Sequence, residues 1–153
     1  MKRIATLLCL VVFALTPACT QGKQPAPAPE PVAHDGLIIV VKGTGFHPAL
    51  GQRIINERHE LLFDPSMVLP ELFADRVCGG YSASPDEAWG LLASWGSRKP
   101  LVISGVETAT GTEVVISDED AKAIMELDQK ADIFSQARIV FLAHPGHGYF
   151  LTE

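Results

Sequence analysis

The sequence has little positive charge, and this shortage excludes one class of partner. It contains 12 lysines and arginines against 18 aspartates and glutamates, which gives a formal net charge of −6 at pH 7. No basic cluster is larger than Arg98-Lys99, whereas binding along a nucleic acid requires a basic patch. We therefore expect no nucleic acid partner, and we assign the acidic excess to solubility.

Motifs of the common enzyme classes are also missing. There is no glycine-rich phosphate loop of the Walker or dinucleotide type, and Gly43-Thr44-Gly45 is too short to count as one. Ser104-Gly105 lacks the pattern of a nucleophile elbow. We therefore favour a binding domain over an enzyme and predict no cofactor, although many enzymes assemble their sites from scattered residues.

An N-terminal export signal is the clearest feature that the sequence does contain. Residues 1–3 are a short cationic start, and residues 4–15 form an almost unbroken apolar run, as in a secretory signal. A transmembrane helix needs roughly 20 apolar residues, and Pro17 ends any helix before that length is reached. We predict that residues 1–18 are a signal peptide.

The end of this signal, Ala18-Cys19, resembles the lipobox of bacterial lipoproteins, in which the cysteine becomes the acylated first residue of the mature chain. The resemblance implies that Cys19 carries lipid. It departs from the family pattern at Thr16 and Pro17, where a large aliphatic residue and then a small one are usual. Thr20 is not the aspartate associated with inner-membrane retention, so the resemblance favours the outer membrane where an organism has two.

The alternative to acylation is ordinary cleavage after Ala18, which would release a soluble periplasmic or secreted protein with a free Cys19. The two outcomes differ in disulfide chemistry. If Cys19 is acylated, Cys78 is alone in the mature chain; if it is not, the two cysteines could form a disulfide in an oxidising compartment.

Residues 19–35 have the composition of a tether. From Gln24 to Pro31 proline alternates with small residues and one glutamate, a composition that adopts an extended polyproline conformation and cannot bury a core. Several acyl chains hold a protein stably on a membrane, where a single chain is marginal. We expect a membrane-anchored cell-envelope protein that binds another envelope protein or a component of the cell wall.

Residues 36–153 predict a single α+β domain with a small sheet of about four to five strands and two or three covering helices. Residues 48–63 fit either a helix, which we favour, or paired strands over 53–56 and 60–63. The remaining strands are expected at residues 37–41, 100–104, 113–116, 138–143 and 149–151. A short helix is expected from Pro70 to Cys78, with Leu72, Phe73 and Val77 facing inward and Gly79 just past its end.

Two helix starts carry strong capping signals. Ser84-Pro85-Asp86-Glu87 combines an N-cap serine, a proline in the first helical position and a glutamate that completes a capping box. The apolar residues that follow, Ala88, Leu91, Leu92 and Trp95, predict one buried face, which leaves Trp89 as an exposed candidate for partner binding. The second start has Ser117 as its N-cap, and we assign Asp118-Glu119-Asp120 to the positive end of the helix dipole rather than to a cation. Its predicted buried stripe is Ile124, Leu127, Ala131 and Phe134.

His144-Pro145-Gly146-His147 is the most conspicuous candidate for chemistry. Proline and glycine at the centre of four residues suit a type II turn, so the two imidazoles would flank the turn and could chelate a metal. Zinc takes four ligands, or three and a water, and His47, His59, His34 or an acidic residue would have to complete the set. We prefer a plain turn with solvated histidines, and keep a divalent metal as the alternative.

Cys78 offers a second route to catalysis. Cys78-Gly79-Gly80-Tyr81 faintly resembles the nucleophile segment of papain-like cell-wall peptidases, with His144 or His147 as the base. In those enzymes the cysteine begins a helix, whereas here it is expected at a helix C-terminus, where the dipole opposes a thiolate. We prefer a buried cysteine. An envelope hydrolase, using a histidine metal site or a Cys/His pair, is therefore the alternative function.

Overall fold

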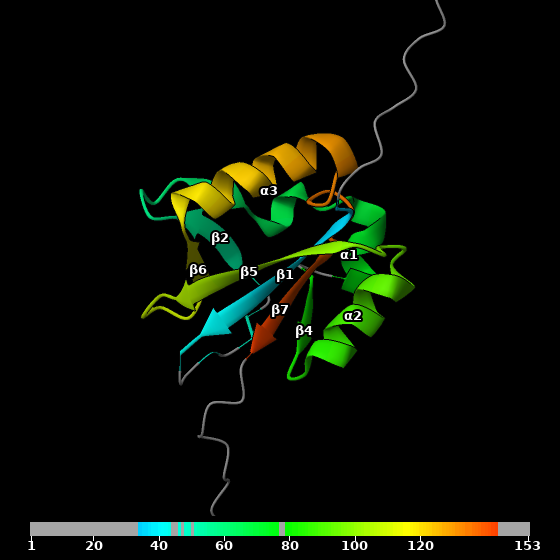
Figure 1. The fold of residues 1–153 in the computed structure, drawn as a ribbon, viewed down its shortest axis with the longest axis horizontal. Coiled ribbons are helices and arrows are strands. Elements are labelled where there is room, and N and C mark those ends of the chain that lie inside the picture. The colour runs from blue at the N-terminus through cyan, green and yellow to red at the C-terminus, as the bar shows by residue number, and fades with distance from the viewer. Residues whose placement is uncertain (1–33, 44–45, 47, 50, 77–78, 144–153) are drawn as a thin grey trace, which may run out of the picture. The chain divides into compact units, whose positions relative to one another are not determined.

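A seven-stranded mixed sheet forms the centre of the domain (Figure 1). The computed structural model describes residues 34–43, 46, 48–49, 51–76 and 79–143. All of these belong to one of the two units into which the chain divides, residues 31–153. The strands are β1 (Gly36–Lys42), β2 (Arg53–Asn56), β3 (Leu61–Phe63), β4 (Gly80–Ser82), β5 (Pro100–Glu107), β6 (Glu113–Ile116) and β7 (Ile139–Ala143).

The strand order is β3-β2-β6-β5-β1-β7-β4. Strands β5, β1, β7 and β4 are parallel to one another, while β6 pairs antiparallel with β5 and parallel with β2. Strand β3 pairs antiparallel with β2 at one edge of the sheet. The parallel block therefore brings the carboxyl ends of four strands to the same end of the domain.

Both faces of this block are packed against other parts of the chain. The helices are α1 (Pro70–Arg76), α2 (Pro85–Ser94) and α3 (Asp118–Ala131), with a short 3-10 turn at Pro65–Met67. Leu37 and Ile39 of β1 belong to the same core cluster as Ile124 of α3, while Ile38 joins Leu92 of α2 in a second cluster. Alternate side chains of a strand point to opposite faces, and burial on both faces explains the unbroken apolar run.

The α+β class is confirmed, but the sheet is larger than the four to five strands predicted from the sequence. The favoured helix over residues 48–63 is wrong, because this segment forms the strands β2 and β3. The side chain of Asn56 accepts from the backbone N–H groups of Arg58 and Glu60, at 3.0 and 2.8 Å, and so closes the turn between the strands. Strand β4, of three residues, was not predicted at all.

Most of the other predicted elements are confirmed. They are the strand β1, the hairpin of β5 and β6, the three helices, the caps at Ser84 and Ser117, and the strand β7. Phe73 was expected to face inward but is 44% exposed, so that prediction is wrong. Val77 and the strand predicted over residues 149–151 lie outside the described residues. Within the part of the chain that the structure describes, no helix is long and apolar enough to cross a membrane.

Candidate functional site

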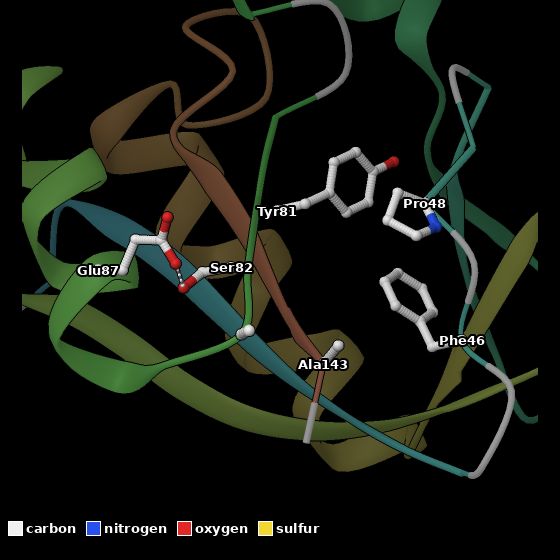
Figure 2. A pocket seen from close by; sticks show the side chains of 7 residues that line it. Phe46, Pro48, Tyr81, Ser82, Glu87 and Ala143 are labelled. Atoms are coloured by element: carbon white, nitrogen blue, oxygen red, sulfur yellow. Dashed lines mark hydrogen bonds between the residues drawn. The ribbon is translucent and has the colours of Figure 1, made fainter. Parts of the chain in front are cut away.

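A pocket of about 410 Å³ lies across the carboxyl ends of β4 and β7 (Figure 2). The first turn of α2 and the segment that follows β1 complete its walls. Ligands of open sheets with parallel strands bind outside the carboxyl ends of those strands, so the pocket occupies the expected place for a binding site. Its lining residues are Phe46, Pro48, Tyr81, Ser82, Ala83, Glu87 and Ala143.

One side of the pocket is aromatic and rigid. Figure 2 shows the rings of Phe46, Pro48 and Tyr81 gathered on the same side of β4. The Tyr81 ring stacks on the buried Phe141 ring, with centroids 5.5 Å apart, and lies 5.9 Å from the Phe46 ring. The Tyr81 hydroxyl donates a hydrogen bond of 2.6 Å to the carbonyl of Ala49. This bond ties the edge strand β4 to the segment after β1 and fixes the position of the ring.

The other side of the pocket carries a hydroxyl and a carboxylate. Ser82 Oγ lies 2.9 Å from Glu87 Oε2 and 2.7 Å from the carbonyl of Ser84, and it accepts from the backbone N–H of Ser84 at 3.1 Å. Ser84 in turn accepts from the N–H of Glu87 at 3.3 Å as the N-cap of α2. Glu87 therefore does not close a capping box with the N–H of Ser84; that N–H is taken by Ser82.

This arrangement determines what the pocket can recognise. Ser82 is 7% exposed, whereas Glu87 is an exposed side chain. Among the described residues, the Glu87 carboxylate accepts a hydrogen bond from the Ser82 hydroxyl through Oε2, so Oε1 can accept from a ligand. A ligand that fits both sides combines an apolar ring or chain with a hydrogen-bond donor, and a cationic donor would also offset the negative charge.

The histidines that were weighed as metal ligands are not brought together by the structure. His47, His144 and His147 lie outside the described residues. His59 is exposed in the turn between β2 and β3, with a backbone φ of 60°, and His34 precedes β1, with Nδ1 3.2 Å from the carbonyl of Lys99. Among the residues described, no group of three or more histidine, cysteine, aspartate or glutamate residues could hold a metal.

The remaining candidates from the sequence are Cys19, Cys78 and Trp89. Cys19, the expected lipidation site, lies outside the described residues, and so does Cys78, on which the thiol hydrolase alternative depends. Trp89 is 44% exposed on α2, as its helical position predicted. It does not line the pocket.

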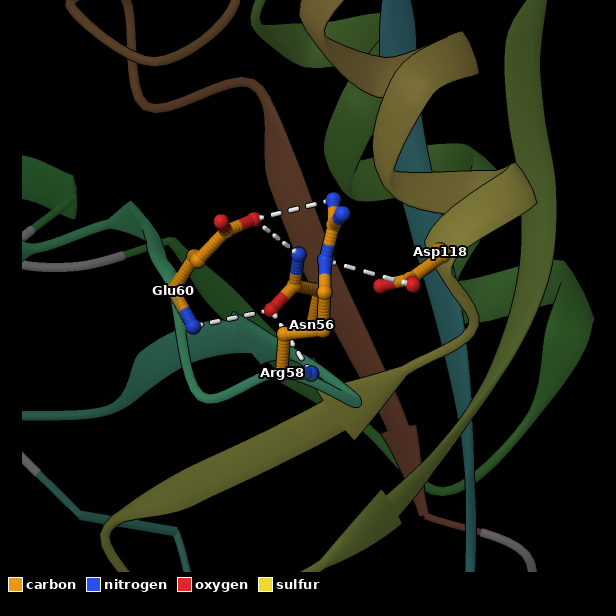
Figure 3. Close-up of polar contacts among 4 residues, drawn as sticks. All are labelled: Asn56, Arg58, Glu60 and Asp118. Carbon is orange, nitrogen blue, oxygen red and sulfur yellow. Dashed lines mark hydrogen bonds and ion pairs between the residues drawn. The ribbon is translucent and has the colours of Figure 1, made fainter.

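The acidic start of α3 is a capping structure, as predicted. The backbone N–H of Asp120 donates to Ser117 Oγ at 3.0 Å, which satisfies the helix terminus. Asp118 belongs to a surface cluster in which Arg58 contacts both Asp118, at 3.4 Å, and Glu60, at 3.1 Å (Figure 3). These contacts join the turn after β2 to α3, which gives the acidic residues a structural role.

Fold and pocket together define a class: an α+β domain with a mixed sheet and a ligand-sized pocket at the carboxyl ends of parallel strands. The family model for the second domain of Treponema pallidum Tp0624 matches residues 36–145 of the 153 in the chain. The chain belongs to this family. The match starts with the first residue of β1 and extends past β7, so it includes every residue that lines the pocket. None of the curated proteins compared with the chain matches it.

Sequence reasoning missed the pocket residues Phe46, Tyr81 and Ser82 and gave Glu87 a different role. Glu87 was interpreted as part of a helix cap, which is correct for its backbone but not for its carboxylate. No local signal marks the pocket, because its residues come from four segments that meet only through the parallel pairing of β1, β7 and β4.

Proposed function

We propose that this chain is a membrane-anchored envelope protein whose domain binds a ligand in the pocket between Phe46, Tyr81 and Glu87. The observation that carries the proposal is the pairing of a rigid aromatic wall with a carboxylate that retains acceptor capacity, at the end of the sheet where such folds bind ligands. The ligand is an apolar ring or chain with an ammonium or hydroxyl donor, carried by an envelope protein or a cell-wall component.

The anchor is the second part of the proposal and rests on the N-terminal sequence. Cys19, acylated, would hold the domain on the outer membrane through the tether of residues 19–35. The chain enters β1 at its amino end, and the pocket lies across the carboxyl ends of β4 and β7, which run parallel to β1. The pocket therefore lies at the end of these strands opposite the end where residues 34 and 35 lead into β1.

Membrane partition tests the anchor. The wild-type chain should fractionate with membranes and show a mass raised by acyl chains, and a Cys19→Ala variant should be recovered in the soluble fraction. A Cys19→Ala variant that remained with membranes would contradict the anchor. The pocket would be unaffected by that result, because it is tested separately.

Two small probes with the same ring and opposite charge test the pocket. We expect 2-phenylethylamine to bind the full chain and 3-phenylpropionate to bind at least about tenfold more weakly, because the Glu87 carboxylate attracts a cation and repels an anion. Binding is measured by NMR chemical-shift changes at Ala83 and Ala143, which line the pocket. A preference for the acid, or no binding of either probe, would contradict the proposal.

Matched variants separate the effect of the Glu87 carboxylate on probe binding from the effect of overall charge. Glu87→Gln should abolish the preference for the amine and leave ring binding in place. Asp86→Asn removes the same charge from the neighbouring residue, which does not line the pocket, and should leave the preference unchanged. Ala83→Phe should block both probes by filling the pocket.

A further inference from the structure

Two arginines lie beside the corner Trp95-Gly96, near the amino ends of β1 and β7 and at the end of these strands opposite the pocket. Arg76 is the last residue of α1, and Arg138 directly precedes β7. The Arg76 guanidinium lies over the Trp95 ring, with Cζ 5.3 Å from the ring centroid. A Cβ added to Gly96 would lie 3.8 Å from Nη2 of Arg138. Both guanidinium groups therefore border the corner Trp95-Gly96, where α2 ends.

The backbone holds these groups in place. Arg76 Nη1 donates a hydrogen bond of 2.7 Å to the carbonyl of Gln136. The carbonyl of Arg138 accepts from the N–H of Leu37 at 2.9 Å, which joins it to the start of β1. Gly96 has a φ of 86°, a conformation that favours glycine and turns the chain sharply after α2. The corner is thus formed by the ends of α1 and α2 and by the residue that precedes β7.

Among the residues that the structure describes, no ion pair neutralises the positive charge at this corner. Within the described residues, the ion pairs join Arg53 to Glu113 and Arg58 to Glu60 and Asp118, and neither Arg76 nor Arg138 takes part in one. Nε of Arg138 is buried and has no hydrogen-bond partner in the same part of the chain. Burial lowers the pKa of Arg76, and the nearby charge of Arg138 lowers it further, while Asp75 opposes the change. A guanidinium group is cationic at neutral pH in proteins.

The carboxylate of Asp35, which lies near Arg138, is already engaged by other donors. Asp35 feels the charge of Arg138, but its oxygens accept from Ser97 Oγ at 2.7 Å and from the backbone N–H groups of Arg98 and Lys99 at 2.7 to 3.0 Å. Asp75 lies in α1, directly before Arg76, and within the described residues it makes no ion pair with either arginine. Two adjacent cations in a chain of net charge −6 are an unusual local arrangement, and an external anion is the simplest way to stabilise it.

We propose that Arg76 and Arg138, beside Trp95, form a binding site for a phosphate group. The planar fork of each guanidinium matches the oxygens of a phosphate, with two parallel N–H donors. The site lies near the point where residues 34 and 35 lead into β1. Trp95 adds an aromatic ring of the kind that is enriched at membrane–water interfaces. The phosphate is supplied either by a lipid headgroup or by a soluble phosphate ester, and the two sources are distinguished by experiment.

The first arm titrates the full-length chain with inorganic phosphate at constant ionic strength. The indole N–H resonance of Trp95 should move, while that of Trp89, an exposed residue of the same helix, serves as the internal reference and should not. Arg76→Gln and Arg138→Gln should each weaken the response about tenfold or more, as expected for loss of hydrogen bonds to a charged group. Arg138→Lys, which keeps the charge and loses the fork, should weaken it less.

The second arm uses vesicles and the full-length Cys19→Ser chain, so that no acyl chain contributes. Phosphatidylcholine vesicles are compared with vesicles that also contain phosphatidylglycerol. A stronger response to phosphatidylglycerol that disappears in Arg76→Gln identifies the lipid headgroup as the source. A response to inorganic phosphate with no vesicle preference identifies a soluble phosphate ester.

Lys42→Gln is the matched control, because it removes one positive charge at the carboxyl end of β1, away from the site. The proposal is overturned if Lys42→Gln weakens phosphate binding as much as the arginine variants do. It is also overturned if neither phosphate nor phosphatidylglycerol moves the Trp95 resonance. Thermal unfolding of each variant shows whether the fold is intact, and Arg138→Lys remains informative if Arg138→Gln does not fold.

Discussion

The two ends of the parallel strands offer opposite chemistry to a ligand. At the carboxyl ends, a pocket combines the rings of Phe46 and Tyr81 with the carboxylate of Glu87. At the amino ends, the guanidinium groups of Arg76 and Arg138 meet at the Trp95-Gly96 corner. A sheet whose strands point the same way makes this possible, because each end collects loops from several strands. We therefore expect a cationic ligand at the carboxyl ends of the strands and an anion at their amino ends.

The largest expected effect tests whether the pocket end is part of the core. Phe141 is fully buried, and its ring contacts both Tyr81 and Phe46. Phe141→Ala should lower the free energy of unfolding by about 3–5 kcal/mol, measured by chemical denaturation. Phe73→Ala, which truncates a ring that is 44% exposed, should cost well under half as much. Equal losses would show that the pocket wall is no better packed than the surface of α1.

A smaller effect is expected from the hydroxyl of Tyr81. Tyr81→Phe removes the hydrogen bond to the Ala49 carbonyl and should cost about 1 kcal/mol of stability. The ring remains, so the affinity for 2-phenylethylamine should change by less than about threefold, which corresponds to a modest loss of preorganisation. A loss of all probe binding would mean that the hydroxyl contacts the ligand directly.

The carboxyl group of Asp35, which lies directly before β1, should make the stability of the fold depend on pH. Burial would raise the pKa of Asp35, but the N–H donors of Arg98 and Lys99 and the Ser97 hydroxyl outweigh it and lower the pKa. A carboxyl whose pKa is lower in the folded state stabilises the fold above its unfolded pKa of about 3.9, and this contribution is lost as pH falls through the folded value. Asp35→Asn should therefore destabilise the protein at pH 7, with a difference that shrinks below about pH 4.

A second variant tests the hydrogen bonds that Asp35 accepts. Ser97→Ala removes one of the donors to Asp35 and should reproduce part of the pH dependence. If denaturation curves of wild type and Asp35→Asn differed by the same amount at pH 3 and pH 7, the network around Asp35 would contribute nothing through its ionisation.

The smallest effect is expected from the exposed ion pairs of Arg58, away from both ends of the parallel strands (Figure 3). Arg58 pairs with Glu60 and Asp118, but its side chain is 66% exposed, and exposed ion pairs contribute about 0–1 kcal/mol. Arg58→Gln should shift the unfolding free energy by less than about 0.5 kcal/mol. Asn56→Ala, which removes the 1% exposed side chain that closes the same turn, should cost about 1–3 kcal/mol. The reverse order would make the charges rather than the amide responsible for the turn.

Elements with local signals could be predicted from the sequence. The caps at Ser84 and Ser117, the apolar run of β1 and the hairpin of β5 and β6 each depend on neighbouring residues. Strands β2 and β4 are different, because they are held by parallel pairing with β6 and β7, far along the chain. Residues 48–63 were assigned to a helix for this reason: their apolar spacing fits a helix locally, and the partner strand that decides the matter is about 60 residues away.

The same reasoning explains why the candidate sites were not foreseen. Phe46, Tyr81 and Glu87 are ordinary residues in sequence and become a pocket only when three parallel strands align their carboxyl ends. Arg76 and Arg138 are separated by 62 positions in the chain and meet only through the packing of α1 and the start of β7 beside the end of α2. The histidines are the leading candidates in the sequence because imidazole chemistry is visible from residue type alone. The pocket and the arginine pair depend instead on contacts between segments that are far apart in the chain.

Intermolecular NOEs from bound 2-phenylethylamine test the central claim most directly. The account predicts that the phenyl protons show NOEs to the rings of Phe46 and Tyr81 and to the methyl group of Ala143. It also predicts that the methylene next to the nitrogen shows NOEs to the side chain of Glu87, and that these disappear in Glu87→Gln. NOEs confined to residues that do not line the pocket, such as Trp89 or Val102, would contradict the assignment of this pocket as the binding site.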